Sequence, residues 1–196
     1  MRPILRSTIL WALAMALSAP AICADNGILF EPATQIPAEG GPGAKLAFLP
    51  SGVALLDGGV GAISLKDGIG LGIGGYSLAS DYVPVHEGVK HDLGYTYGGI
   101  LMDYSFYTKR LFYVNASMMA GPAQGWSVAR AAGSNRVYDN FLQIEPSLNL
   151  MLNVTHELRL GLGLSWRFCA GADLAGDLGT DLDGGAVSFV MMYGSI

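Results

Sequence analysis

The stretch LRLGLGLSWRFCA, residues 158–170, decides the fold of this chain. Its large apolar side chains recur at every second position, and the residues between them are small or basic. A period of two places successive side chains on opposite sides of a β-strand, so the stretch predicts a strand with one apolar face. The apolar face carries Leu158, Leu160, Leu162, Leu164, Trp166 and Phe168, and the other face carries Arg159, Gly161, Gly163, Ser165, Arg167 and Cys169. An unbroken apolar face that ends in two aromatics is typical of a strand that crosses a membrane and reaches the headgroup layer.

Seven further segments have the composition of strands, and several repeat this alternation. One of them places Leu148, Leu150 and Leu152 on an apolar face that we expect to contact lipid, together with the face of residues 158–168. The eight predicted strands cover residues 44–49, 53–64, 69–79, 93–106, 111–120, 138–154, 157–171 and 185–193. Pro146 and the glycine pairs at 58–59, 74–75 and 98–99 predict bulges or local irregularities, because proline cannot donate a ladder bond and glycine weakens a strand.

The composition agrees with a closed barrel in a membrane. Mean hydropathy is +0.39 and only 14% of the residues are charged, yet 28 glycines interrupt the apolar residues. Beyond the first 24 residues there is no apolar run of about 18 residues, the length that a membrane helix needs. A closed barrel is the other structure that satisfies its backbone in lipid.

The N-terminus reads as a secretory signal peptide over residues 1–24. Arg2 and Arg6 precede an apolar run, and small residues ending at Ala21 or Ala24 offer cleavage sites. Residues 25–43 then form an irregular, proline-containing leader, and residues 44–196 form the barrel. After cleavage, 9 basic residues would face 16 acidic ones, a net charge of −7 that argues against nucleic acid as a partner.

The connections between the predicted strands are of two kinds. Residues 65–68, 107–110 and 155–157 are tight turns, whereas residues 80–92, 121–137 and 172–184 are long and polar. Outer-membrane barrels have short periplasmic turns and longer external loops, and an even number of strands leaves both termini in the periplasm.

The polar face predicts a filled lumen. It holds mainly glycine, serine, asparagine and alanine, which fit inside an eight-stranded barrel. Its charged residues Asp103, Glu145, Arg159 and Arg167 balance, and we expect them to form a lumen salt-bridge network, because buried charges require partners. Lys45 and Asp57 are not assigned to a face. A soluble lipocalin-like barrel, which would bind a hydrophobic ligand inside, also alternates and remains an alternative.

The sequence offers little for catalysis or for a cofactor. The glycines at 68, 70, 72 and 74 lie within a predicted strand with no helix after them, so they do not form a nucleotide loop. His86 and His91 share one external loop, but without a third fixed ligand they predict no metal site. An acidic loop at residues 173–183 departs from calcium-loop spacing. Cys169 is expected to be a packed thiol rather than a nucleophile.

The layout resembles small eight-stranded bacterial outer-membrane proteins of the OmpA/OmpX type, and more closely an uncharacterised family of outer-membrane barrel proteins. The matching segments are GLGIGGY at 70–76, GYTYGG at 94–99, FLQIEP at 141–146 and RLGLGLSWR at 159–167. The resemblance implies an up-and-down transmembrane β-barrel and assigns no activity. One departure concerns the C-terminus, because such barrels usually end on an aromatic residue and this chain ends on Ile196.

We therefore expect a monomeric, eight-stranded, antiparallel barrel with a filled polar lumen in the bacterial outer membrane. Its expected role is non-enzymatic, either structural in the envelope or interactive at the surface, with external loops that contact lipopolysaccharide or a partner. No cofactor is expected. An outer-membrane enzyme that modifies lipid through His86 or His91 is one alternative, and a pore is another, although charges filling the lumen argue against conduction.

Overall fold

The computed structural model describes residues 37–65, 68–86, 89–108, 110–130, 135–174 and 182–194. The predicted signal peptide, residues 25–36 of the predicted leader and most of the acidic loop lie outside these ranges. The strands are β1 (Ala38–Leu49), β2 (Gly52–Ser64), β3 (Ile69–Leu78), β4 (Val85–His86), β5 (Val89–Phe106), β6 (Phe112–Ala129), β7 (Val137–Asn153), β8 (Leu158–Ala170) and β9 (Gly184–Gly194). No helix in the described ranges has the length and apolar character needed to cross a membrane.

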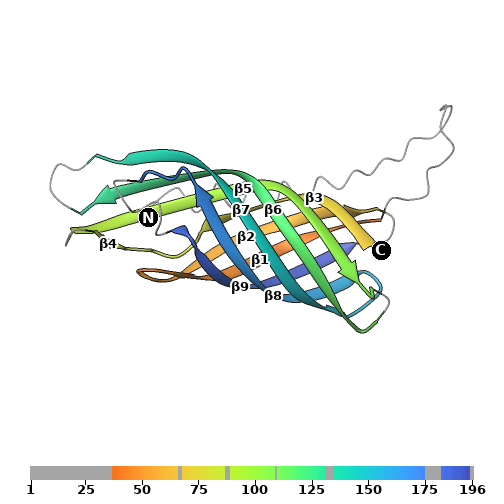
Figure 1. The fold of residues 1–196 in the computed structure, drawn as a ribbon. Coiled ribbons are helices and arrows are strands. Elements are labelled where there is room, and N and C mark those ends of the chain that lie inside the picture. Colours follow the sequence, from red (N-terminus) through yellow and green to blue (C-terminus); the bar gives the residue numbers. More distant parts are fainter. Residues whose placement is uncertain are drawn as a thin grey trace, which may run out of the picture.

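Eight of these strands close into an up-and-down antiparallel barrel (Figure 1). Each strand pairs with the next along the chain, from β5 to β9 and from β1 to β3, and the ring is completed by pairing of β1 with β9 and of β3 with β5. The two-residue strand β4 pairs with the start of β5 and stands outside the ring. The predicted fold class is therefore confirmed.

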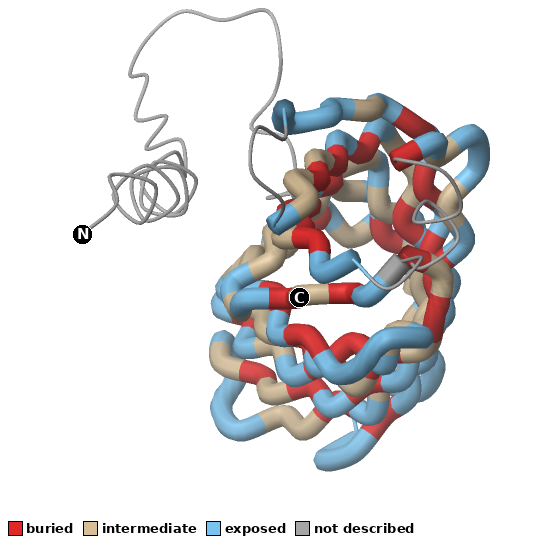
Figure 2. Tube along the Cα trace, turned by 90° about the vertical axis from the view of Figure 1, so that its left-hand side faces the viewer, coloured by how far each residue is buried: buried red, intermediate tan, exposed pale blue. Residues whose placement is uncertain are grey.

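The alternation seen in the sequence becomes an inside and an outside. Along β8 the burial of side chains alternates residue by residue, and Figure 2 shows the same banding around the barrel. Leu162 and Leu164 are 59% and 64% exposed on the outer face, whereas Arg159 and Arg167 are 1% and 2% exposed inside. The apolar side chains thus form a band around the outer wall, which is the arrangement that a lipid environment stabilises.

Two strand boundaries differ from the sequence prediction by more than four residues. β1 begins at Ala38 rather than at residue 44, and β6 continues to Ala129 rather than ending at residue 120. Both extensions pass through Gly-Pro pairs that read as loop. Pro42 still lies within the ladder because it has a cross-strand partner on β2 and none on β9, so its missing N–H leaves the β1–β2 pairing intact.

The glycine pairs do not produce bulges. The β2–β3 and β3–β5 pairings run in one unbroken register through all three glycine pairs. The β5–β6 pairing stops after Tyr97 and resumes at Ile100 in the same register, so a local irregularity lies at Gly98 and Gly99 but adds no residue. At Pro146 the β7–β8 pairing stops and resumes in the same register, so the irregularity predicted there is real but adds no residue. These glycines instead allow close approach of neighbouring groups. A Cβ at Gly58, for example, would collide with the backbone of β3.

The two ends of the barrel differ. At the turn end, the connections that follow Leu65, Phe106 and Asn153 are short. The first residue of β1 and the last residue of β9 also lie at this end. At the loop end, the longer connections leave the barrel, and β5, β6 and β7 extend beyond the other strands (Figure 1). These three strands have 18, 18 and 17 residues, whereas the other five in the ring have 10 to 13.

Candidate functional site: a charged and filled lumen

The centre of the lumen is an ion pair between β1 and β7. The Nζ atom of Lys45 lies 2.8 Å from Oε1 of Glu145, and both side chains are almost fully buried. Both side chains point into the lumen because each residue belongs to the inward-facing set of alternate positions on its strand, which we call the inward phase. The closed ring then brings β1 and β7 to face one another across the lumen. A buried charge is tolerated when it is paired and its remaining lone pairs are satisfied.

Glu145 meets that condition with three further donors. The Tyr97 hydroxyl donates to Oε2 at 2.6 Å, the Ser165 hydroxyl donates to Oε1 at 2.6 Å, and the Gln143 amide donates to Oε2 at 3.2 Å. The carboxylate therefore receives bonds from strands β1, β5, β7 and β8. We call Lys45, Glu145 and the groups bonded to them the charge centre. Because these strands lie on different sides of the ring, the hydrogen bonds of the charge centre connect distant parts of the barrel wall across the lumen.

Lys45 is held by aromatic rings as well as by the carboxylate. Its Nζ lies 3.9 Å from the centroid of the Tyr76 ring and donates to the Tyr97 hydroxyl at 3.1 Å. Tyr76 and Tyr97 stack with centroids 5.8 Å apart. A desolvated ammonium over a tyrosine face gains cation–π attraction in addition to its ion pair.

Arg167 occupies a different environment. Its guanidinium carbon lies 5.5 Å and 6.0 Å from the ring centroids of Tyr95 and Tyr97. Within the described part of the chain no carboxylate lies within 4.0 Å of it, and its Nε and Nη2 atoms have no hydrogen-bond partner. With Lys45 and Glu145, Arg167 gives this centre one excess positive charge.

Near the turn end, Arg159 pairs with Glu39. Glu39 lies on β1, in the first residues of the strand, and Arg159 lies on β8. A small apolar cluster of Tyr113, Met151 and Met192 also lies toward this end of the lumen.

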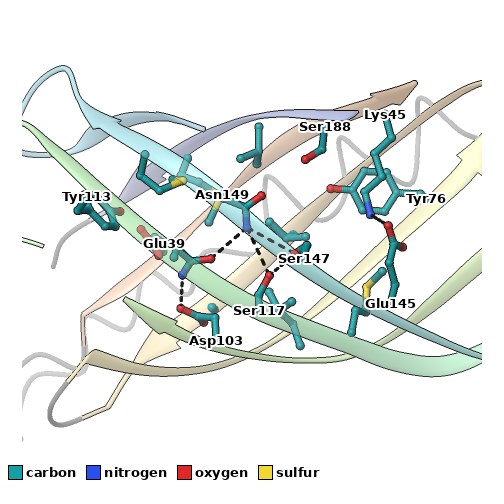
Figure 3. Close-up of a pocket in the computed structure, with 18 residues that line it drawn as sticks. Glu39, Lys45, Tyr76, Asp103, Tyr113, Ser117, Glu145, Ser147, Asn149 and Ser188 are labelled. Carbon is teal, nitrogen blue, oxygen red and sulfur yellow. Dashed lines mark hydrogen bonds and ion pairs between the residues drawn. The ribbon is translucent and has the colours of Figure 1, made fainter. Parts of the chain in front are cut away.

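Between these two charged groups lies a small cavity of about 80 Å³, lined by both polar and apolar side chains (Figure 3). Asn115 donates to Asp103 at 2.7 Å, Asn149 donates to Asn115 at 3.2 Å, and the hydroxyls of Ser117 and Ser147 are 2.6 Å apart. The volume has room for a few water molecules, and the polar side chains among its lining residues supply partners for them. It is much smaller than a pocket for a drug-sized ligand.

At the loop end, aromatic and aliphatic side chains cover the charge centre. Tyr95 stacks on Tyr97 and on Phe141, with centroid separations of 5.2 and 5.9 Å. Leu174 and Leu182, from the connection between β8 and β9, are fully buried in the same cluster. Apolar packing therefore closes the lumen above the ion pair.

The predicted lumen residues all have the inward phase, but their partners differ from the predicted ones. Within the described residues, no ion pair joins two of Asp103, Glu145, Arg159 and Arg167. Glu145 pairs with Lys45, Arg159 pairs with Glu39, and Asp103 accepts a bond from an asparagine. Asp57 lies on the outer face, where it accepts a bond from Ser77 at 3.1 Å. Which inward residues meet depends on the stagger of the strands, and alternation does not encode it.

The predicted lipid-facing residues all have the outward phase. Leu148, Leu150, Leu162, Leu164, Trp166 and Phe168 are exposed, and Leu152, Leu158 and Leu160 are half-buried. The last three lie nearest the turn end.

The remaining candidates do not gather into a site. His91 is buried on β5 and His156 is exposed in the turn between β7 and β8, while the side chain of His86 lies outside the described residues. Cys169 is half-buried beside Asp183. Within the described ranges, no three histidine, cysteine, aspartate or glutamate side chains are close enough to hold a metal ion.

Several lumen residues escaped the sequence reasoning. Glu39 lies in a segment whose glycines and prolines read as an irregular leader, and Tyr95 and Tyr97 stand out in the sequence only as part of a glycine-aromatic motif. Their inward phase was available from the alternation of β5. The identity of their partners was not, because the Lys45–Glu145 pair spans 100 positions.

No family model and no curated protein matches this sequence. Solved structures do match its fold. The N-terminal β-barrel domain of Pseudomonas aeruginosa OprF is 14% identical with a TM-score of 0.54, and the match covers 82% of this chain and 98% of that one. A major outer membrane protein from Thermus thermophilus is 11% identical with a TM-score of 0.53, and that match covers 81% of this chain and 98% of the other. The chain therefore has the fold of a small, eight-stranded outer-membrane β-barrel.

Proposed function

We propose that this chain is a non-enzymatic protein of the bacterial outer membrane whose barrel serves as a rigid anchor and whose loop end makes the contacts. The observation that carries the proposal is the filled lumen. The Lys45–Glu145 centre and the aromatic cluster above it occupy the interior, so the barrel resembles a packed core more than a channel.

The distribution of apolar side chains supports the membrane location. Exposed leucines, isoleucines and aromatics surround the barrel, and aromatic residues such as Phe106 and Phe112 at the turn end and Phe48 and Phe168 toward the loop end flank this band. A lipocalin-like binder would instead direct its apolar side chains inward. By analogy with other barrels, the turn end would face the periplasm and the loop end the exterior. Residues 1–24 would direct export as a signal peptide.

The enzyme alternative rests on His86 and His91. His91 is buried on β5, and the described residues bring no group of three histidine, cysteine or carboxylate side chains together to hold a metal ion. A histidine that acts as a base has to come within hydrogen-bond reach of the substrate, so the burial of His91 favours the non-enzymatic role.

Membrane fractionation with heated and unheated electrophoresis tests the location. We expect the protein in the outer-membrane fraction, with a fast-migrating unheated band that slows after boiling. Recording in planar bilayers tests the filled lumen, and we expect no stable conductance. Recovery of the protein in the soluble periplasm without a heat shift would contradict the membrane proposal, and steady single-channel currents would contradict the anchor role.

A further inference from the structure

The strands β5, β6 and β7 extend beyond the apolar band at the loop end of the barrel. Their outward-facing residues there lie farther along the barrel axis than the band does, and we call this distance toward the loop end their height. On β8, Phe168 is the aromatic residue of the apolar band that lies nearest the loop end. It is ten residues beyond Leu158, the first residue of the strand. On β6, Trp126 is fourteen residues beyond Phe112, the first residue of that strand. A tilted barrel strand rises roughly 2.5 Å per residue along the barrel axis, so Trp126 stands about 10 Å higher.

At this height, two aromatics and an arginine form a cluster on the outer face, which we call the ledge. Trp126 and Tyr138 are cross-strand partners in the β6–β7 ladder. The guanidinium of Arg136 lies 4.1 Å from the centroid of the Trp126 ring and 5.9 Å from that of Tyr138, and its Nη1 donates to the Tyr138 hydroxyl at 3.3 Å. Tyr138 is 58% exposed.

Amide side chains adjoin the ledge on the side of the apolar band. Gln124 and Asn140 face outward two residues nearer the turn end on the same two strands, and their amides share a hydrogen bond of 3.1 Å. Both are exposed. Toward the loop end, the outer face of the β6–β7 hairpin therefore changes in composition. The apolar band is followed by the two amide side chains and then by the two aromatic rings with the arginine.

The inner face of the same hairpin is already occupied. Phe141 and Ala123 are buried there against Leu174 and Leu182. The hairpin is thus a packed wall rather than a flexible flap, and its outer face is the side that would meet the surrounding leaflet.

The charge of Arg136 is available on this surface. Among the described residues it makes no ion pair, in contrast to Arg130 nearby, which donates two bonds of 2.9 and 2.6 Å to Asp92. That carboxylate raises the pKa of Arg130 above its ordinary value. Arginine that stacks on an aromatic ring keeps N–H groups free, and its planar fork suits phosphate.

We propose that the ledge binds the phosphorylated sugar headgroup of lipopolysaccharide in the surrounding outer leaflet. Arg136 would contact a phosphate, Trp126 and Tyr138 would pack on a sugar face, and Gln124 and Asn140 would bond its hydroxyls. The height of the ledge places these groups beyond the acyl chains, where such a headgroup lies. The inference rests on the proposed function, because the loop end must face the outer leaflet.

Binding of purified lipopolysaccharide to the refolded, full-length barrel in detergent tests the ledge. The probe is a short-core lipopolysaccharide, compared with the same preparation after removal of its phosphates and with phosphatidylglycerol. We expect Arg136→Gln to weaken binding of the phosphorylated probe by about tenfold, the loss of one charge-assisted contact. Dephosphorylation should weaken wild-type binding similarly and should add little to Arg136→Gln.

Arg130→Gln is the matched control, since it removes an exposed arginine of the same end that is engaged by Asp92. It should change binding by less than about twofold, because its charge is already satisfied. Trp126→Leu should weaken both forms of the probe, since it removes the sugar platform. The heat-shifted band shows that each variant is folded.

Equal binding by Arg136→Gln and Arg130→Gln would overturn the inference, and so would equal binding of phosphatidylglycerol, which would mean simple charge attraction. These results would leave the outer-membrane location intact. Failure of the fractionation experiment would instead remove the proposed function, whatever the binding in detergent.

Discussion

Lys45 and Glu145 face each other across the lumen at 2.8 Å, although 100 positions of sequence separate them. The pair joins the first strand of the barrel to β7, and Tyr97 and Ser165 add bonds to it from β5 and β8. A contact of this kind forms only when the ring is closed in the correct register. It is therefore a sensitive test of the structure.

Replacing one member of this pair should be costly. Lys45→Met leaves the Glu145 carboxylate buried without its cation, and we expect the unfolding free energy to fall by about 3–5 kcal/mol. The double variant Lys45→Met with Glu145→Leu should recover most of that loss, because neither member of the pair is then left buried without the other, and Arg167 keeps its aromatic neighbours. Urea unfolding of the barrel in lipid vesicles, followed by the heat-shifted band, measures both. A single variant as stable as the double one would contradict the pairing.

Arg167 should behave differently from Lys45. The structure gives it aromatic neighbours and no carboxylate within ion-pair distance in the described chain, so its removal leaves the Lys45–Glu145 pair neutral overall. We expect Arg167→Met to change the unfolding free energy by less than about 1 kcal/mol, since removing a buried charge that has no ion-pair partner also removes its desolvation cost. The same urea titration measures it. A loss as large as that of Lys45→Met would restore the network predicted from charge balance.

The cost of placing a charged side chain on the outer face should depend on its position along the barrel axis. Leu162 is 59% exposed within the apolar band, and Leu162→Arg should cost about 2–4 kcal/mol if that position lies at the middle of the membrane. Gln124→Arg, outward-facing above the band, should cost less than about 1 kcal/mol. Unfolding in lipid vesicles compares the two variants. Equal effects would mean that the band does not lie in hydrocarbon.

The seam between the first and last strands depends on a glycine. A Cβ at Gly41 would collide with the backbone carbonyl of Met191 on β9, whereas a Cβ at Gly61 would find its nearest neighbour, the Glu39 carbonyl oxygen, at 3.8 Å. We expect Gly41→Ala to destabilise the barrel by about 1–3 kcal/mol through overpacking, and Gly61→Ala to be close to neutral. The fraction of heat-shifted protein after refolding reports closure. Equal refolding yields for the two variants would argue against this close approach.

The alternation of apolar and polar residues along the chain is sufficient to predict much of this fold. Residues 158–170 predicted a strand with Leu162 outside and Arg167 inside, and the structure has both. The short turns likewise predicted an up-and-down order. These features depend on neighbouring residues, because the two faces of a strand follow from its local backbone geometry.

Strand ends were less accessible to sequence reasoning. β1 includes a Gly-Gly-Pro-Gly segment and β6 continues through Gly121 and Pro122, which local propensity assigns to loops. In the barrel, adjacent strands offer a continuous ladder to both segments, and these tertiary hydrogen bonds outweigh the weak local preference.

The sequence by itself thus determined an outer-membrane type of barrel, which side chains of its strands point outward, and the polar residues of its lumen. Only the tertiary structure decided that Glu145 pairs with Lys45, that Arg159 pairs with Glu39, and that Trp126 and Arg136 meet above the band. The physical reason is that phase along a strand is local, whereas the neighbours of a lumen or wall residue are set by strand tilt and stagger around the closed ring.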